Sequence, residues 1–206
     1  MILRKLIDIF SYLFHPVLMP TIATGFYFYI TRFYYPAQEI FIVSFQVFVT
    51  TFLLPIAVYL FLKSTGILQS GIMVKKNGER LLPIFMNIVL IGFLVFFILR
   101  PNPNLVLKKF LVAYSLSYII AFGFVMLKKK VSIHMLSFVA MIPLIFNTTL
   151  AVNYSPLLIL SGLILLTGIL ASSRLSMRAH THTQIIQGTI IGLVPQLAIF
   201  YLGYFF

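Results

Sequence analysis

The segment 172–184 carries the side chains best suited to chemistry, because it places two arginines, two histidines and several hydroxyl groups between two long apolar runs. The segments 75–80 and 128–134 are also rich in basic residues, and the second of them ends with Ser132 and His134. Histidine can attack phosphorus or move a proton, and arginine and lysine can stabilise the charge of a transferring phosphoryl group. The three segments together predict a phosphate site. The alternative is that each is a solvated basic loop.

The spacing within the segment 172–184 favours one of its histidines. His180 and Gln184 lie four residues apart, so a helix that begins near Ala179 would bring them to the same face, where Gln184 could orient the imidazole. His182 would point elsewhere, and we expect it to be a solvated neighbour. His134 is likewise expected near the start of a helix, where free N–H groups and the helix dipole favour an anion.

The composition is that of a membrane protein. Of the 206 residues, 61% are hydrophobic and 9% are charged, whereas a soluble domain has about 25% charged residues. The mean hydropathy is +1.09. We therefore expect a single all-α membrane domain over residues 1–206, built as a helix bundle of six to seven transmembrane helices plus an N-terminal amphipathic helix.

The net charge of +12 comes from 15 lysines and arginines against three acidic residues. Because the basic residues lie in short loops, anionic lipid headgroups or a phosphate ligand are better partners for them than nucleic acid. Three acids can hardly form the carboxylate cage that Mg²⁺ requires, and the absence of cysteine excludes disulfides and cysteine-ligated metals. We expect neither a metal nor a cofactor, and the sequence does not indicate an oligomeric state.

Hydropathy divides the chain into an N-terminal amphipathic segment and a series of apolar spans. Residues 1–15 have apolar side chains at helical spacing, which predicts an interfacial helix or a lead-in to the first span, with His15 at the interface and a break at Pro16. Gly188 and Gly192 predict a helix-packing face in the last span. The predicted spans are 17–35, 40–62, 81–99, 108–127, 133–151, 156–172 and 184–205.

Two spans separate each basic segment from the next, so all three segments should emerge on the same side of the membrane. That side, with the N-terminus, holds eleven of the 15 lysines and arginines, which predicts a cytoplasmic face by the positive-inside rule. Phosphate-binding residues among the eleven would bias this count, so an outward-facing site stays open. The shared side would let one pocket gather Lys75, Lys76, Arg80, Ser132, His134, Arg174 and His180.

Three short motifs resemble those of the type 2 phosphatidic acid phosphatases, the membrane relatives of the vanadium haloperoxidases. Ser173 and Arg174, followed by five residues and His180, match the Ser-Arg-x5-His part of the third family motif. The segment 131–134, Val-Ser-Ile-His, resembles a degenerate form of the second, Pro-Ser-Gly-His. The segment 75–83 loosely resembles the first, Lys-x6-Arg-Pro. The order of the three is that of the family, and the resemblance spans residues 75–190.

The resemblance implies an enzyme that hydrolyses a lipid phosphate without a metal, in a bacterial cytoplasmic (inner) membrane. It implies that His180 is the nucleophile that forms a phosphohistidine, and that His134 is the general acid for the leaving oxygen. Phosphatidate, phosphatidylglycerophosphate and polyprenyl phosphates or diphosphates are the candidate substrates. The residues that would bind phosphate oxygens are Arg174, Arg80, Ser132 and one of Lys75 and Lys76.

This chain departs from the family pattern where an aspartate normally stands four residues after the nucleophile, since that position is Gln184. A glutamine carbonyl can accept the Nδ1–H bond but cannot offset the charge of an imidazolium. An alternative is therefore a catalytically impaired relative that binds lipid phosphates or scaffolds membrane partners. A haem protein would need two facing axial ligands at membrane depth, which His134 and His180 do not offer. A transporter is disfavoured because the hydropathy shows no inverted repeat.

Overall fold

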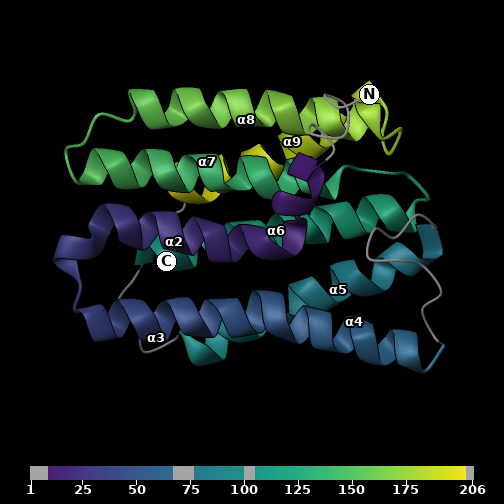
Figure 1. Cartoon of the computed structure of the whole chain (residues 1–206), viewed down its shortest axis with the longest axis horizontal. Helices are drawn as coiled ribbons and strands as arrows, with labels where there is room; N and C mark the ends of the chain where they lie inside the picture. Colours follow the sequence, from purple (N-terminus) through teal and green to yellow (C-terminus); the bar gives the residue numbers. More distant parts are fainter. Residues whose placement is uncertain (1–8, 67–76, 100–104, 203–206) are drawn as a thin grey trace.

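The computed structural model describes residues 9–66, 77–99 and 105–202. All regular structure within these ranges is helical, and the described residues contain no strand. The long helices run side by side along one axis (Figure 1). The predicted class, an all-α polytopic membrane bundle, is confirmed.

The chain begins with short helical elements and continues with long ones. Residues 9–13 are helical, and a break at His15 leads into the 3-10 turn η1 (Pro16–Leu18). The remaining elements, in chain order, are α2 (Met19–Thr31), the 3-10 turn η2 (Arg32–Tyr34), α3 (Ala37–Phe48), the π-helical turn η3 (Val49–Leu53), α4 (Leu54–Ser64), α5 (Asn77–Phe93), the π-helical turn η4 (Leu94–Ile98), α6 (Leu105–Met126), α7 (Ile133–Ala151), α8 (Leu157–Ser176), α9 (His182–Leu197) and the π-helical turn η5 (Ala198–Leu202).

Six helical stretches of the described chain are long and apolar enough to cross a membrane. They correspond to the second and later predicted spans, with boundaries that differ by a few residues. They are Ala37–Ser64, Leu81–Ile98, Leu105–Met126, Ile133–Ala151, Leu157–Ser176 and His182–Leu202.

The first predicted span, 17–35, forms a shorter α-helix than expected. Helix α2 has 13 residues, whereas a transmembrane α-helix needs about 20. Prolines limit it at both ends. Pro16 and Pro20 stand in its entry, and Tyr35 adopts an extended conformation (φ −130°, ψ 143°), as a residue before proline tends to do. Hydropathy alone does not detect these boundaries, because most of the residues beyond them in 17–35 are also apolar or aromatic.

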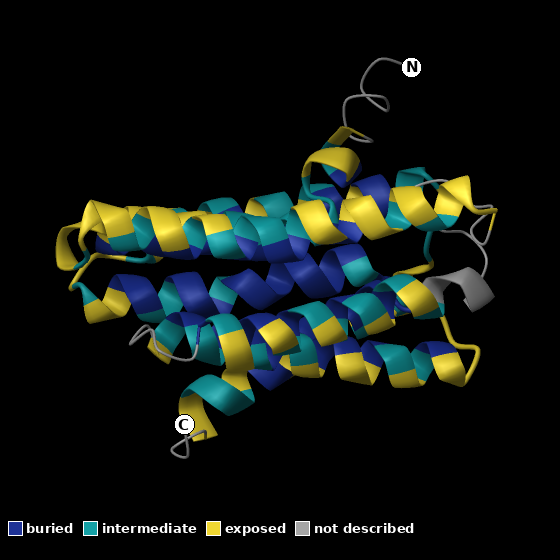
Figure 2. Cartoon of the chain, turned by 90° about the horizontal axis from the view of Figure 1, so that it is seen from below, coloured by how far each residue is buried: buried dark blue, intermediate teal, exposed yellow. Residues whose placement is uncertain are grey.

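The outer surface of the bundle is apolar as well as its interior. Large hydrophobic side chains such as Phe41, Phe97, Leu158 and Leu165 are exposed, and exposed residues follow the outer faces of the helices (Figure 2). A soluble protein would not leave so much apolar surface in water. The surface is suited to contact with lipid chains, which makes this an integral membrane protein.

Helix α7 forms the centre of the bundle. In its membrane window 72% of the residues are buried, against 22–44% in the other spans. It packs between α2, α6, α8 and α9. A side chain at the N-terminal end of α7 is therefore surrounded by protein on all sides, and this end carries His134.

The packing of α9 on α7 depends on two glycines. A Cβ at Gly188 would collide with the carbonyl oxygen of Ser132, and a Cβ at Gly192 would collide with that of Leu136. The predicted packing face of Gly188 and Gly192 is confirmed. Because Ser132 directly precedes α7, this close approach sets the distance between the start of α7 and the start of α9.

Candidate functional site

Three chain segments that are far apart in the sequence meet at one end of the bundle. They are the N-terminal residues 9–18, the turn between α6 and α7, and the turn between α8 and α9 (Figure 1). Here His134, Arg174 and His180 line one cavity of about 130 Å³. The second and third basic segments thus contribute these three residues to the same end of the bundle, as two spans between the segments predict.

The turn between α8 and α9 has a defined geometry. After α8 ends at Ser176, Arg178 adopts a left-handed conformation (φ 50°). The N–H of Arg178 donates to the carbonyl of Leu175 at 2.9 Å, and that of Ala179 donates to the carbonyl of Arg174 at 3.1 Å. This is the Schellman pattern, which satisfies the last carbonyls of a helix and reverses the chain. It returns His180 to the cavity beside Arg174.

A second local motif orients His180. Helix α9 begins at His182, and Thr181 and Gln184 form a capping box at its start. The Oε1 of Gln184 lies 3.4 Å from the N–H of Thr181 and 2.9 Å from Nδ1 of His180. A backbone N–H can only donate, so the amide presents its oxygen to both groups, and Nδ1 of His180 must then be the second donor.

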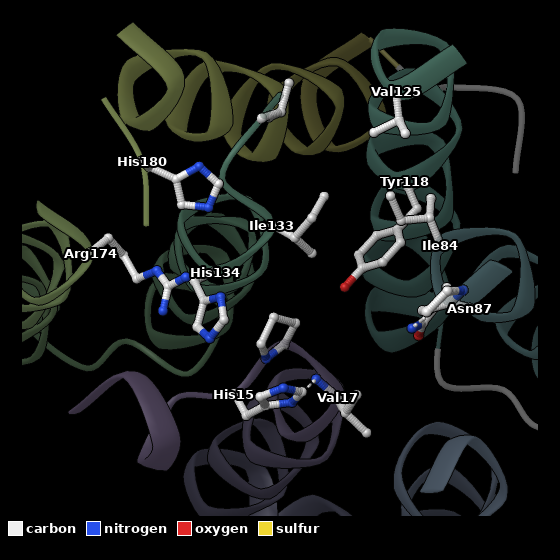
Figure 3. A pocket seen from close by; sticks show the side chains of 13 residues that line it. His15, Val17, Ile84, Asn87, Tyr118, Val125, Ile133, His134, Arg174 and His180 are labelled. Atoms are coloured by element: carbon white, nitrogen blue, oxygen red, sulfur yellow. Dashed lines mark hydrogen bonds between the residues drawn. The ribbon is translucent and has the colours of Figure 1, made fainter. Parts of the chain in front are cut away.

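The capping box therefore fixes the tautomer of His180. In the neutral ring the proton is on Nδ1, and Nε2 keeps its lone pair. The predicted hydrogen bond between His180 and Gln184 is present, although α9 begins three residues later than Ala179. Figure 3 shows the His180 ring at the cavity, opposite the α5 and α6 walls. His182 is exposed, as expected.

His134 is held by the N-terminal segment. It lies in the first turn of α7, is 7% exposed, and has its Nε2 at 3.1 Å from the backbone oxygen of Ser11. A carbonyl only accepts, so Nε2 of His134 carries a proton and donates it. In the neutral ring the lone pair is then on Nδ1.

Ser132 positions the start of α7 and does not line the cavity. Its hydroxyl accepts from the N–H of Met135 at 3.5 Å, and its own N–H donates to the backbone carbonyl of Gln184 at 3.2 Å. The second contact joins the N-cap of α7 to the first turn of α9. Ser132 is fully buried, so the structure assigns it to holding the two histidine-bearing helix starts together.

Arg174 brings a positive charge to the cavity from the last turn of α8. It is only 5% exposed, and Nη1 donates to the sulfur of Met177 at 3.9 Å. Beside it, Ser173 is fully buried and its hydroxyl is hydrogen-bonded to that of Ser11. Figure 3 shows the guanidinium next to His134. A buried cation beside two imidazoles is suited to binding an anion.

His15 is a third histidine of the cavity, and the sequence reasoning missed it. Its ring centroid lies 5.5 Å from that of His134, at an interplanar angle of 84°. Its Nδ1 accepts from the N–H of Val17 at 3.4 Å, so the proton of the neutral ring is on Nε2. His15 was expected only as a residue at the membrane interface, and its place in this cavity was not predicted.

The described part of the N-terminal segment packs against the rest of the protein through Ser11. Ser11 is fully buried and contacts both Ser173 and His134. The helical spacing of apolar residues in 1–15 cannot distinguish a helix on lipid from one on protein. The one sequence signal for this arrangement is that His15 directly precedes Pro16. Proline restricts the backbone at this point, which gives the histidine a defined position.

The burial of His15 predicts a measurable titration. Burial, and secondly the charge of Arg174, lower the pKa of His15 from 6.5 to about 4. A lowered histidine pKa means that the folded state favours the neutral ring. This contribution to stability is full above pH ~6.5 and is lost as the pH falls towards ~4.

We therefore expect the ¹⁵N signals of the His15 ring, assigned by their loss in His15→Gln, to titrate near pH 4 in detergent. The thermal unfolding temperature of the wild type should fall between pH 6.5 and pH 4, and His15→Gln should reduce that fall. A His15 midpoint near 6.5 would show that the ring is solvated and would contradict its placement.

The first predicted motif is only partly within the described residues. Lys75 and Lys76 lie outside them, and so does the side chain of Arg80, whose backbone is in the first turn of α5. The next turns of α5 do reach the cavity, where Pro83, Ile84 and Asn87 form part of the wall. Arg80 stands one helical turn before Ile84.

Tyr118 of α6 also lines the cavity, and no sequence pattern singled it out. Its hydroxyl is 3.0 Å from that of Ser137 and 3.3 Å from that of Tyr114, which in turn donates to the carbonyl of Pro16 at 3.2 Å. These buried hydroxyl groups tie α6 and α7 to the chain just after His15, and so hold the third histidine against the other two.

Within the described residues, no group of three or more His, Asp or Glu side chains is arranged to hold a metal ion. No family model matches this chain, and neither a curated protein nor a solved structure matches it. The site consists of three histidines and a buried arginine at one end of the helix bundle.

Proposed function

We propose that this protein is a membrane-bound lipid phosphate phosphatase that acts through a phosphohistidine on His180. One observation carries the proposal. The carbonyl oxygen of Gln184 accepts from both Thr181 and His180, which puts the lone pair of the neutral His180 ring on Nε2, and His180 lines a cavity with Arg174 and His134. A nucleophile oriented by a second group is the arrangement expected for covalent catalysis.

In the first step, Nε2 of His180 attacks phosphorus. A P–N bond forms while the bond from phosphorus to the ester oxygen breaks. Arg174 stabilises the charge on the phosphoryl oxygens. The leaving oxygen needs a proton, and a phosphate monoester near pH 6 still carries one. That proton can pass through Nδ1 of His134, which accepts it and then donates it to the leaving oxygen.

In the second step, water attacks the phosphohistidine. Nε2 of the neutral His134 ring donates to the carbonyl of Ser11, so the lone pair is on Nδ1. Nδ1 can therefore take a proton from the attacking water. The P–N bond breaks with its electrons returning to Nε2 of His180, and inorganic phosphate leaves with the proton that His134 gives back to it. His134 thus serves as a proton relay in both directions, which refines the expectation that it is a general acid.

The same proposal places the protein in a bacterial cytoplasmic membrane, with the site at one membrane surface. Among the described residues, Lys63, Arg174, Arg178 and the three lysines 128–130 lie at the site end, while Arg32, Lys108 and Lys109 lie at the other end. The positive-inside rule gives a cytoplasmic site from this asymmetry. Cations that bind phosphate would weaken that argument for the site residues themselves.

A catalytically impaired lipid phosphate binder is the second candidate, and Gln184 favours it. The amide fixes the tautomer of His180, but it supplies no negative charge to stabilise the imidazolium that forms during phosphoryl transfer. Binding of a lipid phosphate needs only the cavity and Arg174, so binding would survive where turnover is slow.

The test is a phosphate-release assay with the purified protein in detergent on phosphatidate, phosphatidylglycerophosphate, polyprenyl phosphate and polyprenyl diphosphate. We expect release from at least one of them, and a ³²P label on histidine that is stable to base and lost in acid. Binding of these lipids without release would contradict the phosphatase and support the binder.

A further inference from the structure

A second, larger cavity adjoins the histidine site. It has a volume of about 340 Å³, within the range of roughly 300–1,000 Å³ that is typical of small-molecule sites. His15, Val17, Pro83 and Asn87 line both cavities. The two are therefore neighbours with a common wall. We call the larger one the apolar chamber, because its other lining residues are almost all hydrophobic or aromatic.

The apolar chamber extends from the site end of the bundle towards the middle of the membrane. Its walls on the helix η3–α4 run from Phe52 to Leu62. Ten residues of helix correspond to about 15 Å, which is half of the ~30 Å thickness of the hydrocarbon core. Leu82 and Met86, in the first turns of the described spanning part of α5, form the facing wall.

The helix on one side of the chamber is irregular at the same depth. The π-helical turn η3 precedes Pro55, and both Phe52 and Pro55 line the chamber. The hydroxyls of Thr21 and Thr51 lie 3.3 Å apart and tie η3 to α2. Single π-helical turns within α-helices occur often at functional sites. Here the turn marks the deep end of the chamber.

From this arrangement we propose that the apolar chamber seats one hydrocarbon chain of the lipid whose phosphate lies among His15, His134, Arg174 and His180. A volume of 340 Å³ spread over about 15 Å of depth has the girth of one extended chain and not of two. A single chain as short as that of dodecyl phosphate fits within this depth, whereas a longer chain, such as that of a polyprenyl phosphate, would extend beyond the chamber into the bilayer. A lipid with two chains would leave one of them in the bilayer.

His15 has a specific place in this proposal. It lines both cavities and sits where the phosphate and the first carbons of the chain would meet. The ring has an apolar body and a polar edge, and the neutral form expected from its lowered pKa is compatible with a neighbouring hydrocarbon. The headgroup in this proposal rests on the proposed function, whereas the chain site rests on the chamber alone.

Photo-crosslinking tests the chain site without any turnover. The probe is dodecylphosphonate with a diazirine at the far end of the chain, which cannot be hydrolysed because its phosphorus is bound to carbon. In nanodiscs of neutral lipid, we expect crosslinks on the peptide that contains residues 52–62, and we expect excess unlabelled dodecylphosphonate to remove them. Crosslinks spread over lipid-facing residues and insensitive to competition would mean bulk bilayer lipid only and would overturn the proposal.

A matched pair of tryptophan variants tests the same chamber by filling it. Met86→Trp places a large side chain in the chamber, whereas Val89→Trp, three residues on in α5, places it on the exposed outer face. We expect Met86→Trp to reduce the competed crosslinking by tenfold or more and Val89→Trp to leave it unchanged. Equal effects of both variants would contradict the chain site.

The turnover arm separates the two proposals. If the enzyme is active, Met86→Trp should lower kcat/KM for dodecyl phosphate by tenfold or more and leave that for butyl phosphate unchanged, because a butyl chain is too short to depend on the length of the chamber. If no phosphate is released from any substrate while competed crosslinks appear at 52–62, the phosphatase fails and the chain site stands. If phosphate is released from both substrates and Met86→Trp changes kcat/KM equally for both, the chain site is overturned and the phosphatase stands.

Discussion

Replacing His180 with alanine is expected to abolish the release of phosphate from lipid phosphates, with a fall in kcat of about 10³-fold or more, as for other covalent nucleophiles. The variant lacks the imidazole to which the proposed P–N bond forms, while Arg174 and His134 keep their places. Binding of dodecylphosphonate should therefore persist. The measurement is phosphate release in detergent, together with the ³²P label on histidine, which should disappear.

His182→Ala is the matched control for this experiment. His182 stands two residues away, at the first position of α9, and its side chain is exposed. The two variants remove the same chemical group from the same turn, but only His180 lines the cavity. His182→Ala should keep wild-type activity. Full turnover by His180→Ala, or equal losses in both variants, would remove His180 from the mechanism.

Gln184 gives the second large effect, and its replacement can change activity in either direction. Gln184→Met keeps the length of the side chain but removes the acceptor for Nδ1–H of His180. The ring can then carry its proton on Nε2, where no nucleophilic lone pair remains. In a serine protease triad the change of the orienting aspartate to asparagine costs about 10⁴ in kcat, partly through the tautomer. We expect a loss of about 10²- to 10⁴-fold in kcat here.

Gln184→Glu should act in the opposite way. Glutamate has the reach of glutamine, and it is a standard residue at this position of a capping box, so both the helix start and the bond to His180 are retained. The carboxylate adds a negative charge beside the developing imidazolium. We expect kcat to rise by about tenfold, which corresponds to ~1.4 kcal/mol. Aspartate is one methylene shorter and would reach His180 less well from the same backbone position.

Gln187→Glu controls for the added charge, because it lies on the same helix but outside the cavity. It should leave kcat within about twofold. A Gln184→Met variant with undiminished activity would contradict the role of the tautomer. A wild type without activity that becomes active as Gln184→Glu would identify the natural chain as the impaired binder.

Much of the site could be predicted from spacing and from the number of spans. The even number of spans between His134 and Arg174 places both at one end, whatever the exact helix boundaries. The pairing of His180 with Gln184 holds even though α9 begins at His182 and not near Ala179. The reason is that the third residue of a capped helix turns its side chain back over the N-terminus, where His180 lies just before the cap.

The contribution of the N-terminal segment could not be predicted in the same way. Ser11 meets Ser173, which lies 162 residues later, and neither residue has a local pattern that indicates the contact. Hydropathy reports how apolar a segment is, but it does not distinguish lipid from protein as the partner of that surface. The contribution of His15 to the cavity was therefore not predicted, and the apolar chamber beside it had no signal in the sequence.

The contacts of Ser11 have a consequence for biogenesis. Because synthesis proceeds from the N-terminus, residues 11–15 leave the ribosome and reach the membrane well before residues 173–184 are made. The carbonyl oxygen of Ser11 must wait for α7, which brings His134, and the hydroxyl of Ser11 must wait for the α8–α9 hairpin, which brings Ser173. A nascent chain would hold its histidines apart, so the lipids around a translocon would meet a competent pocket only after the last hairpin has closed it.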